Sequence, residues 1–407
     1  MSSPLTVSRA SAMYVGALLG PGLLIVPGLT ASIAGPASVL TWSGLLVLSG
    51  LLGWVFAALG IRVPSATGVR GYVTAGLGAR TAATTSWTFL AGIITGTPIV
   101  SMIGASYVAE LTGSGRVTAC VVAVGITAAV LLITSRGLRT SSTVQSGLVL
   151  LLLGVVTLSV IGGALSSDAG NWTPFAPHGW TAVGTAAAPL MLAFVGWEAA
   201  APLTARLTDP RRQLPRIVTI TLVVTSVLYL ALAAVTIGAL GPDGGGSTPV
   251  AKLLVLAVGP AGLLLAAVSA VVLTIGTVNA YVSGAATLAR SLTRDSLDLD
   301  TPPRWLNAAI LTSSGVLISL FGAGVLDLDA LVAVPSTMFL VVYLGCTASA
   351  WRVLSGGVRV AAAVAFAVVL VILGFTGTAG LAAAAVALVA WAFTRTPVTA
   401  GSARART

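Results

Sequence analysis

The chain has 407 residues, of which 57% are hydrophobic and only 7% are charged. A soluble domain carries about 25% charged residues, so this composition excludes a soluble globular fold and predicts an integral membrane protein. The net charge of +10 does not indicate nucleic-acid binding, because the arginines are spread along the chain instead of forming one basic patch.

The cysteine and histidine residues of the chain argue against a metal or cofactor site. Cys120 and Cys346 both lie in apolar runs, and the single histidine, His178, lies in a loop. This pattern favours neither a disulfide framework nor a cysteine or histidine metal site. We therefore expect no metal and no cofactor.

Long apolar runs without a two-residue alternation predict transmembrane helices, each of roughly 20 residues. We expect an all-α integral membrane protein with 12 transmembrane helices in one domain, 1–407. The last two spans are short and glycine-rich, and two separate spans are favoured over one re-entrant hairpin. The predicted spans are 12–34, 38–61, 84–111, 116–135, 143–165, 182–206, 216–240, 260–290, 305–324, 329–351, 358–375 and 377–394.

The distribution of basic residues supports this count and gives an orientation. With a cytoplasmic N-terminus, only Arg116 and Lys252 of the 20 lysines and arginines fall in outside loops. Cytoplasmic loops of membrane proteins carry such an excess of positive charge. Both termini are therefore expected in the cytoplasm, with residues 395–407 as a cytoplasmic tail.

The first span contains an interruption. The stretch 18-LLGPGLLIVPG-28 places Gly20, Pro21 and Gly22 near the middle of the predicted helix. Proline lacks the backbone N–H, and glycine weakens a helix interior, so peptide groups here lose their helical partners. In lipid, protein, ligand or water must satisfy these groups. A simple proline kink is the alternative for this span taken alone.

The sixth span contains a second interruption at a similar depth. In 190-LMLAFVGWEAAAPL-203, Gly196 lies mid-span and Pro202 follows. Spans 1 and 6 are the first helices of two five-helix halves, residues 1–165 and 182–351. Residues 358–394 then form two extra helices. Paired interruptions of this kind are typical of inverted-repeat transporters with a substrate site at the bilayer midplane.

Backbone N–H and C=O groups that lack helical partners can bind the two charged groups of a zwitterion. Backbone N–H groups at a helix N-terminus can hold a carboxylate, and freed carbonyl oxygens can hold an ammonium. An α-amino acid carries both groups. The sequence therefore predicts an amino-acid transporter that works by alternating access.

Glu198 is an acidic residue deep in a predicted span. Intramembrane carboxylates are costly and usually face a cavity. Two interpretations stay open: a gate or proton-sensitive switch beside the substrate, or a carboxylate that caps or bridges the broken helix. The first makes H⁺ the favoured coupling ion, while sodium coupling and facilitated exchange stay open.

Mid-span polar groups are further candidates for the pocket walls. Thr95 and Thr97 lie in the third span, and Thr277, Asn279 and Ser283 lie in the eighth. Most such hydroxyls bond a carbonyl of their own helix. Asn279 is harder to satisfy in this way and is the stronger candidate.

Three segments resemble signatures of the amino acid–polyamine–organocation (APC) transporter superfamily. They are 20-GPGLLIVPG-28, 194-FVGWEAAAPLTARLTDPRRQLPRIV-218 and, more loosely, 278-VNAYVSGAATLARSLTRD-295. Within this superfamily the chain most resembles bacterial inner-membrane exporters of methionine and branched-chain amino acids. The resemblance implies the LeuT-like 5+5 inverted repeat with broken helices 1 and 6, and it implies location in a bacterial cell membrane.

The resemblance also implies roles for individual residues. A substrate carboxylate is expected near the amides around Gly22 and Leu23, and an ammonium near the carbonyls of Leu18, Leu192 and Val195. Phe194 and Trp197 are then candidates for covering the substrate. Pro21 stands where the superfamily often has Ser or Thr, which removes donors from the carboxylate site. The predicted substrate-binding set is Leu18, Gly20, Pro21, Gly22, Leu23, Thr97, Leu192, Phe194, Val195, Gly196, Trp197 and Asn279.

Other functions fit the sequence less well. A membrane enzyme needs clustered catalytic groups, and one histidine with one deep glutamate does not supply them. A channel needs a filter or a ring of pore-lining groups. Uptake, exchange, or transport of amines and other organic cations remain alternatives to export of small apolar amino acids. A monomer and a homodimer are both compatible with the chain.

Overall fold

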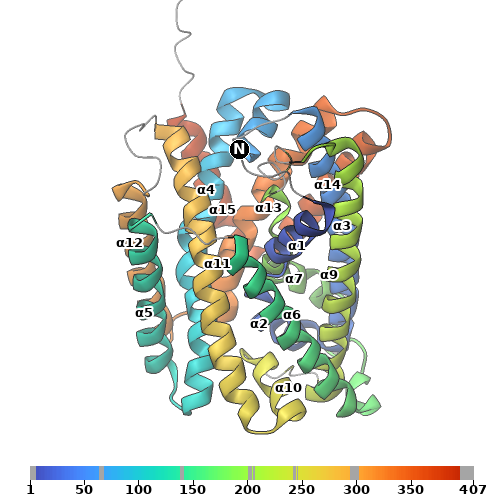
Figure 1. The fold of residues 1–407 in the computed structure, drawn as a ribbon, viewed down its shortest axis with the longest axis vertical. Coiled ribbons are helices and arrows are strands. Elements are labelled where there is room, and N and C mark those ends of the chain that lie inside the picture. Colours follow the sequence, from blue (N-terminus) through green and yellow to red (C-terminus); the bar gives the residue numbers. More distant parts are fainter. Residues whose placement is uncertain are drawn as a thin grey trace, which may run out of the picture.

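The computed structural model describes residues 6–63, 68–137, 142–199, 204, 207–241, 244, 246–293 and 302–394 (Figure 1). Over these ranges the chain is almost entirely helical, and none of them forms a strand. Only helices and closed barrels satisfy their backbone in lipid, so this architecture suits a membrane protein.

The first part of the chain forms two helical halves in place of the predicted first span, followed by four long helices. The break in the first span lies between α1 and α2, where the sequence predicts it. The elements are α1 (Val7–Leu18), α2 (Gly22–Ala34), η1 (Gly35–Ala37), α3 (Ser38–Arg62), α4 (Val69–Thr112), α5 (Arg116–Ser135) and α6 (Ser142–Leu165).

The second part begins with short helical pieces. Over the described residues 181–199 the chain is not one continuous helix, because α7 gives way to 3₁₀ turns and an extended residue before Trp197. Pro202 lies outside the described residues. The elements are η2 (Ala169–Trp172), α7 (Thr181–Leu190), η3 (Met191–Phe194), η4 (Trp197–Ala199), α9 (Pro210–Leu240), α10 (Pro249–Val258) and α11 (Ala261–Thr293).

The last part forms four helices: α12 (Arg304–Gly322), α13 (Leu328–Val353), α14 (Gly356–Gly374) and α15 (Gly377–Phe393). The two glycine-rich runs at the end are thus two separate helices. Among the described residues, 9 helical stretches are long and apolar enough to cross a membrane. Three shorter apolar stretches are 181–194, 249–258 and 377–393.

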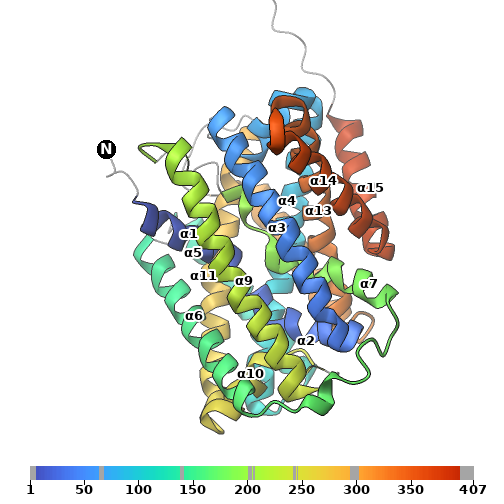
Figure 2. The same cartoon turned by 90° about the vertical axis from the view of Figure 1, so that its right-hand side faces the viewer.

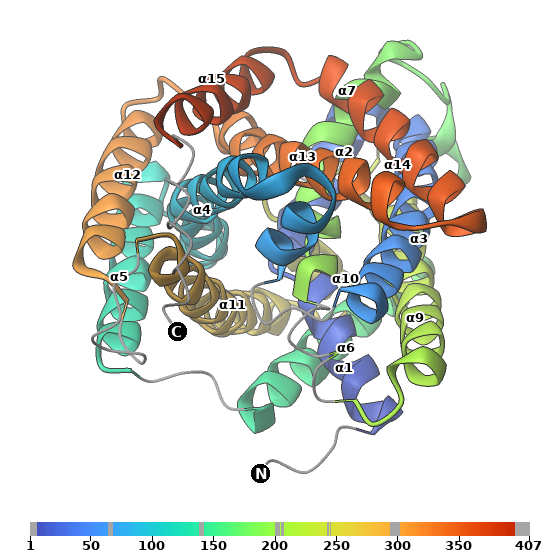
Figure 3. The same ribbon diagram turned by 90° about the horizontal axis from the view of Figure 1, so that it is seen from above.

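The helices differ in how deeply they are buried. α4 and α13 pack along each other, and 78% and 67% of their most apolar segments are buried, whereas the corresponding figure for α12 and α14 is 28%. From above, α2 and α13 lie toward the middle, and α5, α12, α15, α14, α3 and α9 lie at the rim (Figure 3). The side view shows α3 and α9 packed side by side (Figure 2). α2, the second half of the broken first span, therefore lies inside a helical shell.

Three helical segments extend beyond the predicted spans. α4 begins at Val69 and turns sharply at Gly78, whose φ of 84° favours glycine. α9 begins at Pro210, six residues before the predicted span 216–240, because Asp209 caps it and proline suits the first helical turn. α10 occupies part of a predicted outside loop.

Candidate substrate site

The first interruption runs from Leu19 to Pro21. α1 ends at Leu18, and the Gly20 N–H donates back to the Leu18 carbonyl oxygen at 2.8 Å. α2 restarts with Pro21 as its N-cap, without a side-chain capping bond. The Leu23 N–H donates to the Gly20 carbonyl oxygen at 3.1 Å. Among the described residues no group accepts a hydrogen bond from the Gly22 N–H, so this buried amide has no partner in the described part of the chain.

The second interruption is sharper. Val195 is extended, with φ −75° and ψ 133°, and Gly196 has φ 148°. Residues with a Cβ rarely adopt this φ, which explains why glycine occupies the position. A Cβ at Gly196 would also lie 2.6 Å from the carbonyl oxygen of Ala17, in the last turn of α1. The second interruption therefore lies against the backbone of the last turn of α1, directly before the first interruption.

A further contact joins the segment that follows the first interruption to the segment that precedes the second. A Cβ at Gly22 would lie 3.3 Å from the Cγ of Leu192 in η3. The start of α2 thus packs on η3 just as the end of α1 packs on Gly196. The structure brings together the two segments that the sequence singles out.

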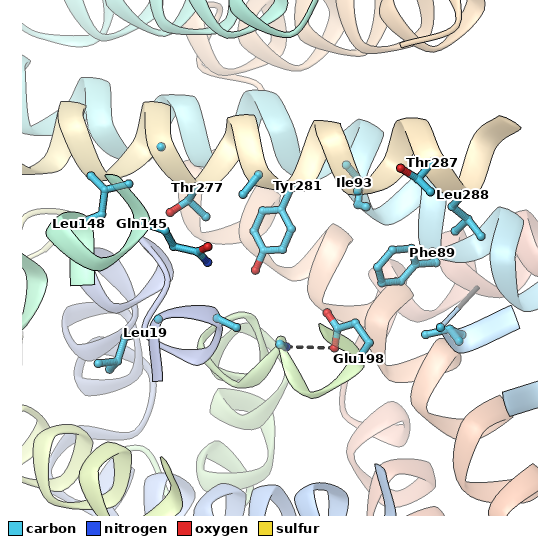
Figure 4. A pocket seen from close by; sticks show the side chains of 18 of the residues that line it. Leu19, Phe89, Ile93, Gln145, Leu148, Glu198, Thr277, Tyr281, Thr287 and Leu288 are labelled. Carbon is cyan, nitrogen blue, oxygen red and sulfur yellow. Dashed lines mark hydrogen bonds between the residues drawn. The ribbon is translucent and has the colours of Figure 1, made fainter. Parts of the chain in front are cut away.

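A cavity of about 440 Å³ lies beside both breaks. It is bounded by α1, α4, α6, η4 and α11, and Figure 4 shows Glu198 on one wall, with Thr277 and Tyr281 of α11 opposite. Small-molecule sites commonly have volumes of about 300–1,000 Å³. Among the predicted site residues, only Gly196 and Glu198 line this cavity.

The cavity reaches one end of the helical bundle. Its lining includes Gly68 and Val69 at the start of α4 and Leu288 and Ser291 near the end of α11. There the Arg70 guanidinium donates to the carbonyl oxygen of Ser291. The mouth therefore lies where α4 begins.

Beyond its start at the first interruption, α2 is closely packed against other segments of the chain. A Cβ at Gly28 would lie 2.3 Å from the Gly246 carbonyl oxygen and 2.8 Å from that of Gly244. A His178 ring nitrogen lies 3.0 Å from the Ile33 carbonyl oxygen near the end of α2. The conformation is thus open on one side of the breaks and closely packed on the other.

A second, small cavity of about 30 Å³ adjoins the first. Thr97, Leu192 and Val195 line it, so it holds three more of the predicted site residues. Its walls are mainly apolar, and Ile93 and Tyr281 border both cavities. An apolar side chain suits these walls better than a charged one.

Glu198 caps the second interruption. Its Oε2 accepts hydrogen bonds from the Gly196 N–H at 3.0 Å and from the Tyr343 hydroxyl of α13 at 2.8 Å. These two hydrogen bonds fit the capping and bridging interpretation of this carboxylate. Its side chain also borders the large cavity (Figure 4), so a change in its charge would change the charge of the cavity wall.

Phe194 and Trp197, predicted to cover the substrate, pack away from both cavities. The Phe194 ring lies 5.2 Å from the ring of Tyr229 and 6.1 Å from that of Trp42. The Trp197 indole N–H donates to Ser49 Oγ of α3 at 2.8 Å. Neither side chain is among those that line the cavities, so in this conformation both anchor the broken segment to the surrounding helices.

The mid-span polar groups divide into two sets. The hydroxyls of Thr95 and Thr97 donate to the carbonyl oxygens of Ala91 and Ile93 in their own helix, as expected for such groups. Thr277 instead lines the large cavity. Asn279 is buried on α11 and does not line either cavity.

Sequence reasoning missed the tyrosines. All six tyrosines of the chain lie in helices. Tyr107 donates to the Leu24 carbonyl oxygen at 2.5 Å, Tyr343 bonds Glu198, and Tyr281 lines both cavities. The signal available in the sequence was a phenol deep in an apolar span, since a buried tyrosine hydroxyl usually finds a hydrogen-bond partner.

No metal site is formed by the described part of the chain: it holds no group of three or more His, Cys, Asp or Glu side chains that could bind a metal ion. The polar side chains that line the cavity are instead Gln145, Glu198, Thr277, Tyr281, Thr287 and Ser291. These groups suit an organic ligand held by hydrogen bonds and charge.

The position of Trp197 gives a stability prediction. Ser49→Ala removes the acceptor of a fully buried indole N–H, and we expect a loss of about 1–3 kcal/mol in unfolding free energy. Thermal unfolding in detergent measures this loss. Ser43→Ala is the control, because its hydroxyl bonds Val39 of the same helix. Equal stability of the two variants would contradict the anchoring contact.

Two interrupted helices around a cavity, in a bundle of long apolar helices, define a membrane transporter for small molecules. The chain belongs to the amino acid permease family, whose family model matches residues 5–390. The family match covers nearly the whole chain, so the protein is an amino-acid transporter of the APC type.

Curated relatives agree with this assignment. The chain is 28% identical over 361 residues to the uncharacterized amino acid permease YecA of Bacillus subtilis, covering 86% of this chain and 85% of the relative. It is 27% identical over 390 residues to the L-methionine/branched-chain amino acid exporter YjeH of Escherichia coli, covering 93% and 92%. The branched-chain amino acid permease BcaP of Bacillus subtilis is 27% identical over 247 residues, 55% of this chain.

Proposed function

We propose that the protein exports small apolar amino acids, such as methionine and the branched-chain amino acids, across a bacterial inner membrane by alternating access. The observation that carries this proposal is the contact between the two interruptions beside the large cavity. The apolar walls of the small cavity support an apolar side chain. The name of the E. coli relative supports the substrate class and the direction.

In this proposal, backbone atoms bind the carboxylate and the ammonium that all amino-acid substrates share. The Gly22 amide, at the N-terminus of α2, receives the carboxylate, and the carbonyls of Leu18, Leu192 and Val195 receive the ammonium. The Leu23 amide becomes available when its 3.1 Å bond to Gly20 opens. Gly20 and Pro21 supply the turn at which these groups lie.

The topology belongs to the same proposal. The chain crosses the membrane twelve times, with 1–165 and 182–351 as inverted repeats and 358–394 as two further helices. Both termini lie in the cytoplasm, so the cavity mouth near Arg70 faces the cytoplasm. The tight packing around Gly28 then closes the outside, and the conformation faces inward.

Glu198 links this cycle to protons. Its carboxylate caps Gly196 while also facing the cavity, so its protonation would change both the break and the local charge. The proposal is therefore an antiport of amino acid against H⁺.

Counterflow in proteoliposomes tests the substrate class. We expect vesicles loaded with unlabelled methionine to accumulate labelled methionine, leucine and isoleucine, with rates that depend on pH but not on sodium. Charged amino acids should exchange at least about tenfold more slowly, because the small cavity offers their side chains no charged partner. Exchange of simple amines without any amino acid would overturn the proposal in favour of an organic-cation transporter.

A further inference from the structure

One buried hydroxyl lies between the two interrupted helices. Tyr229 of α9 is fully buried, and its hydroxyl oxygen lies 2.8 Å from the Leu18 carbonyl oxygen and 2.7 Å from that of Ala193. Leu18 is the last residue of α1, and Ala193 lies in η3. One side chain from a third helix therefore reaches the freed carbonyls of both breaks.

A phenol has a single hydrogen, so it cannot make two full hydrogen bonds to two acceptors at once. The hydrogen is shared between the carbonyls or passes from one to the other. The Leu18 carbonyl lies at the C-terminus of α1, the negative end of the helix dipole. Its oxygen is therefore a stronger hydrogen-bond acceptor. Any movement of α1 relative to η3 then changes how the hydrogen is divided.

The ring of Tyr229 is held in place by its neighbours. Trp42 of α3 lies 5.3 Å from it, edge-on, and Phe194 lies 5.2 Å from it. The Trp42 indole N–H donates to Thr30 Oγ1 of α2 at 3.1 Å. The hydroxyl is therefore fixed relative to α3, α9 and α2, while the two carbonyls lie at the ends of short segments.

We propose that Tyr229 is a positioning residue that couples the two interrupted helices, because its shared hydroxyl hydrogen makes the ends of α1 and η3 move together. This inference builds on the proposed alternating-access function, since coupled movement of the two breaks is what exposes the peptide groups to substrate. Tyr229 does not line either cavity, so it acts on substrate through Leu18 and Ala193.

Hydrogen exchange of the full-length protein tests the coupling without any substrate. In Tyr229→Phe we expect exchange about five- to tenfold faster in peptides from both 15–20 and 190–196, as for loss of one hydrogen bond. Tyr107→Phe is the matched control, since its hydroxyl donates to the Leu24 carbonyl oxygen of α2 and not to either of the two tested segments. Exchange in peptides from 15–20 and 190–196 should therefore stay as in wild type. A change in only one of the two peptides, or in neither, would overturn the inference.

Transport kinetics give the second readout. We expect Tyr229→Phe to lower kcat for methionine counterflow about tenfold while KM changes less than about threefold, because the loss acts on movement more than on binding. An unchanged kcat would contradict the coupling role. Lack of transport by the wild-type protein would count against the proposed function alone, since the exchange measurement would still test the coupling.

The wild-type protein provides a measurement if Tyr229→Phe does not fold. Saturating methionine should slow exchange in 15–20 and in 190–196 by the same factor, because one hydroxyl holds both segments. Protection of only one segment would overturn the inference.

Discussion

Gly196→Ala is expected to abolish transport, lowering counterflow at least about 100-fold. The φ of 148° at this position is strained for any residue with a Cβ. The added carbon would also lie 2.6 Å from the Ala17 carbonyl oxygen. Backbone atoms cannot rotate away as a side chain would, so α1 must shift and the cavity wall at Ala17 and Gly196 must change.

The control for this variant is Gly125→Ala on α5. A Cβ there meets no atom within 4 Å, and alanine suits a helix interior better than glycine. Its counterflow should equal that of wild type. Equal amounts of folded protein, measured by size-exclusion chromatography, separate loss of transport from loss of folding. Normal transport by Gly196→Ala would show that the contact between the breaks is not required.

Glu198→Gln is expected to remove the pH dependence of transport while leaving exchange in place. Glutamine keeps an oxygen that can accept from the Gly196 N–H and the Tyr343 hydroxyl, but it cannot take up a proton. A step that needs one proton changes about tenfold per pH unit, so wild-type net transport should vary strongly between about pH 6 and about pH 8. The variant should show a flat profile.

Glu110→Gln provides the matched control for Glu198→Gln. Glu110 is an exposed carboxylate near the end of α4 and does not line either cavity. It should keep the wild-type pH profile. A Glu198→Gln protein with the wild-type pH dependence would mean that Glu198 is only a structural cap, and the proton-coupling proposal would fail.

The sequence predicts the breaks well because their causes are local. Pro21 lacks an N–H wherever it is placed, and a mid-span glycine pair beside it weakens the helix further. Gly196 next to the ionisable Glu198 is unusual for the same local reason. The structure places an interruption at both positions.

Which side chains face the cavity depends on long-range packing, and the sequence did not show it. Trp197 follows Gly196 directly, yet it bonds Ser49, which lies on α3. Tyr229 lies 36 residues after Ala193 and bonds it across the bundle. A one-residue rotation of a 3₁₀ turn redirects a side chain by about 120°. Orientation at an irregular break therefore cannot be read from periodicity.

The sequence does not predict the helix at 69–77 or the short α10, for another reason. Neither segment has the roughly 20 consecutive apolar residues that predict a membrane-spanning helix. Gly78 separates the first from the rest of α4, and Thr248 precedes the second. Their place at the two ends of the bundle became clear only from the structure.

Competition with modified substrates tests the central claim that bare peptide groups at the two breaks bind both ends of a zwitterion. Methionine counterflow should be inhibited by unlabelled methionine, and at least about 100-fold more weakly by N-acetylmethionine or by the decarboxylated amine, because each lacks one charged group for the backbone. Equal inhibition by the amine and by methionine would contradict the account, since it would leave the Gly22 amide without a role.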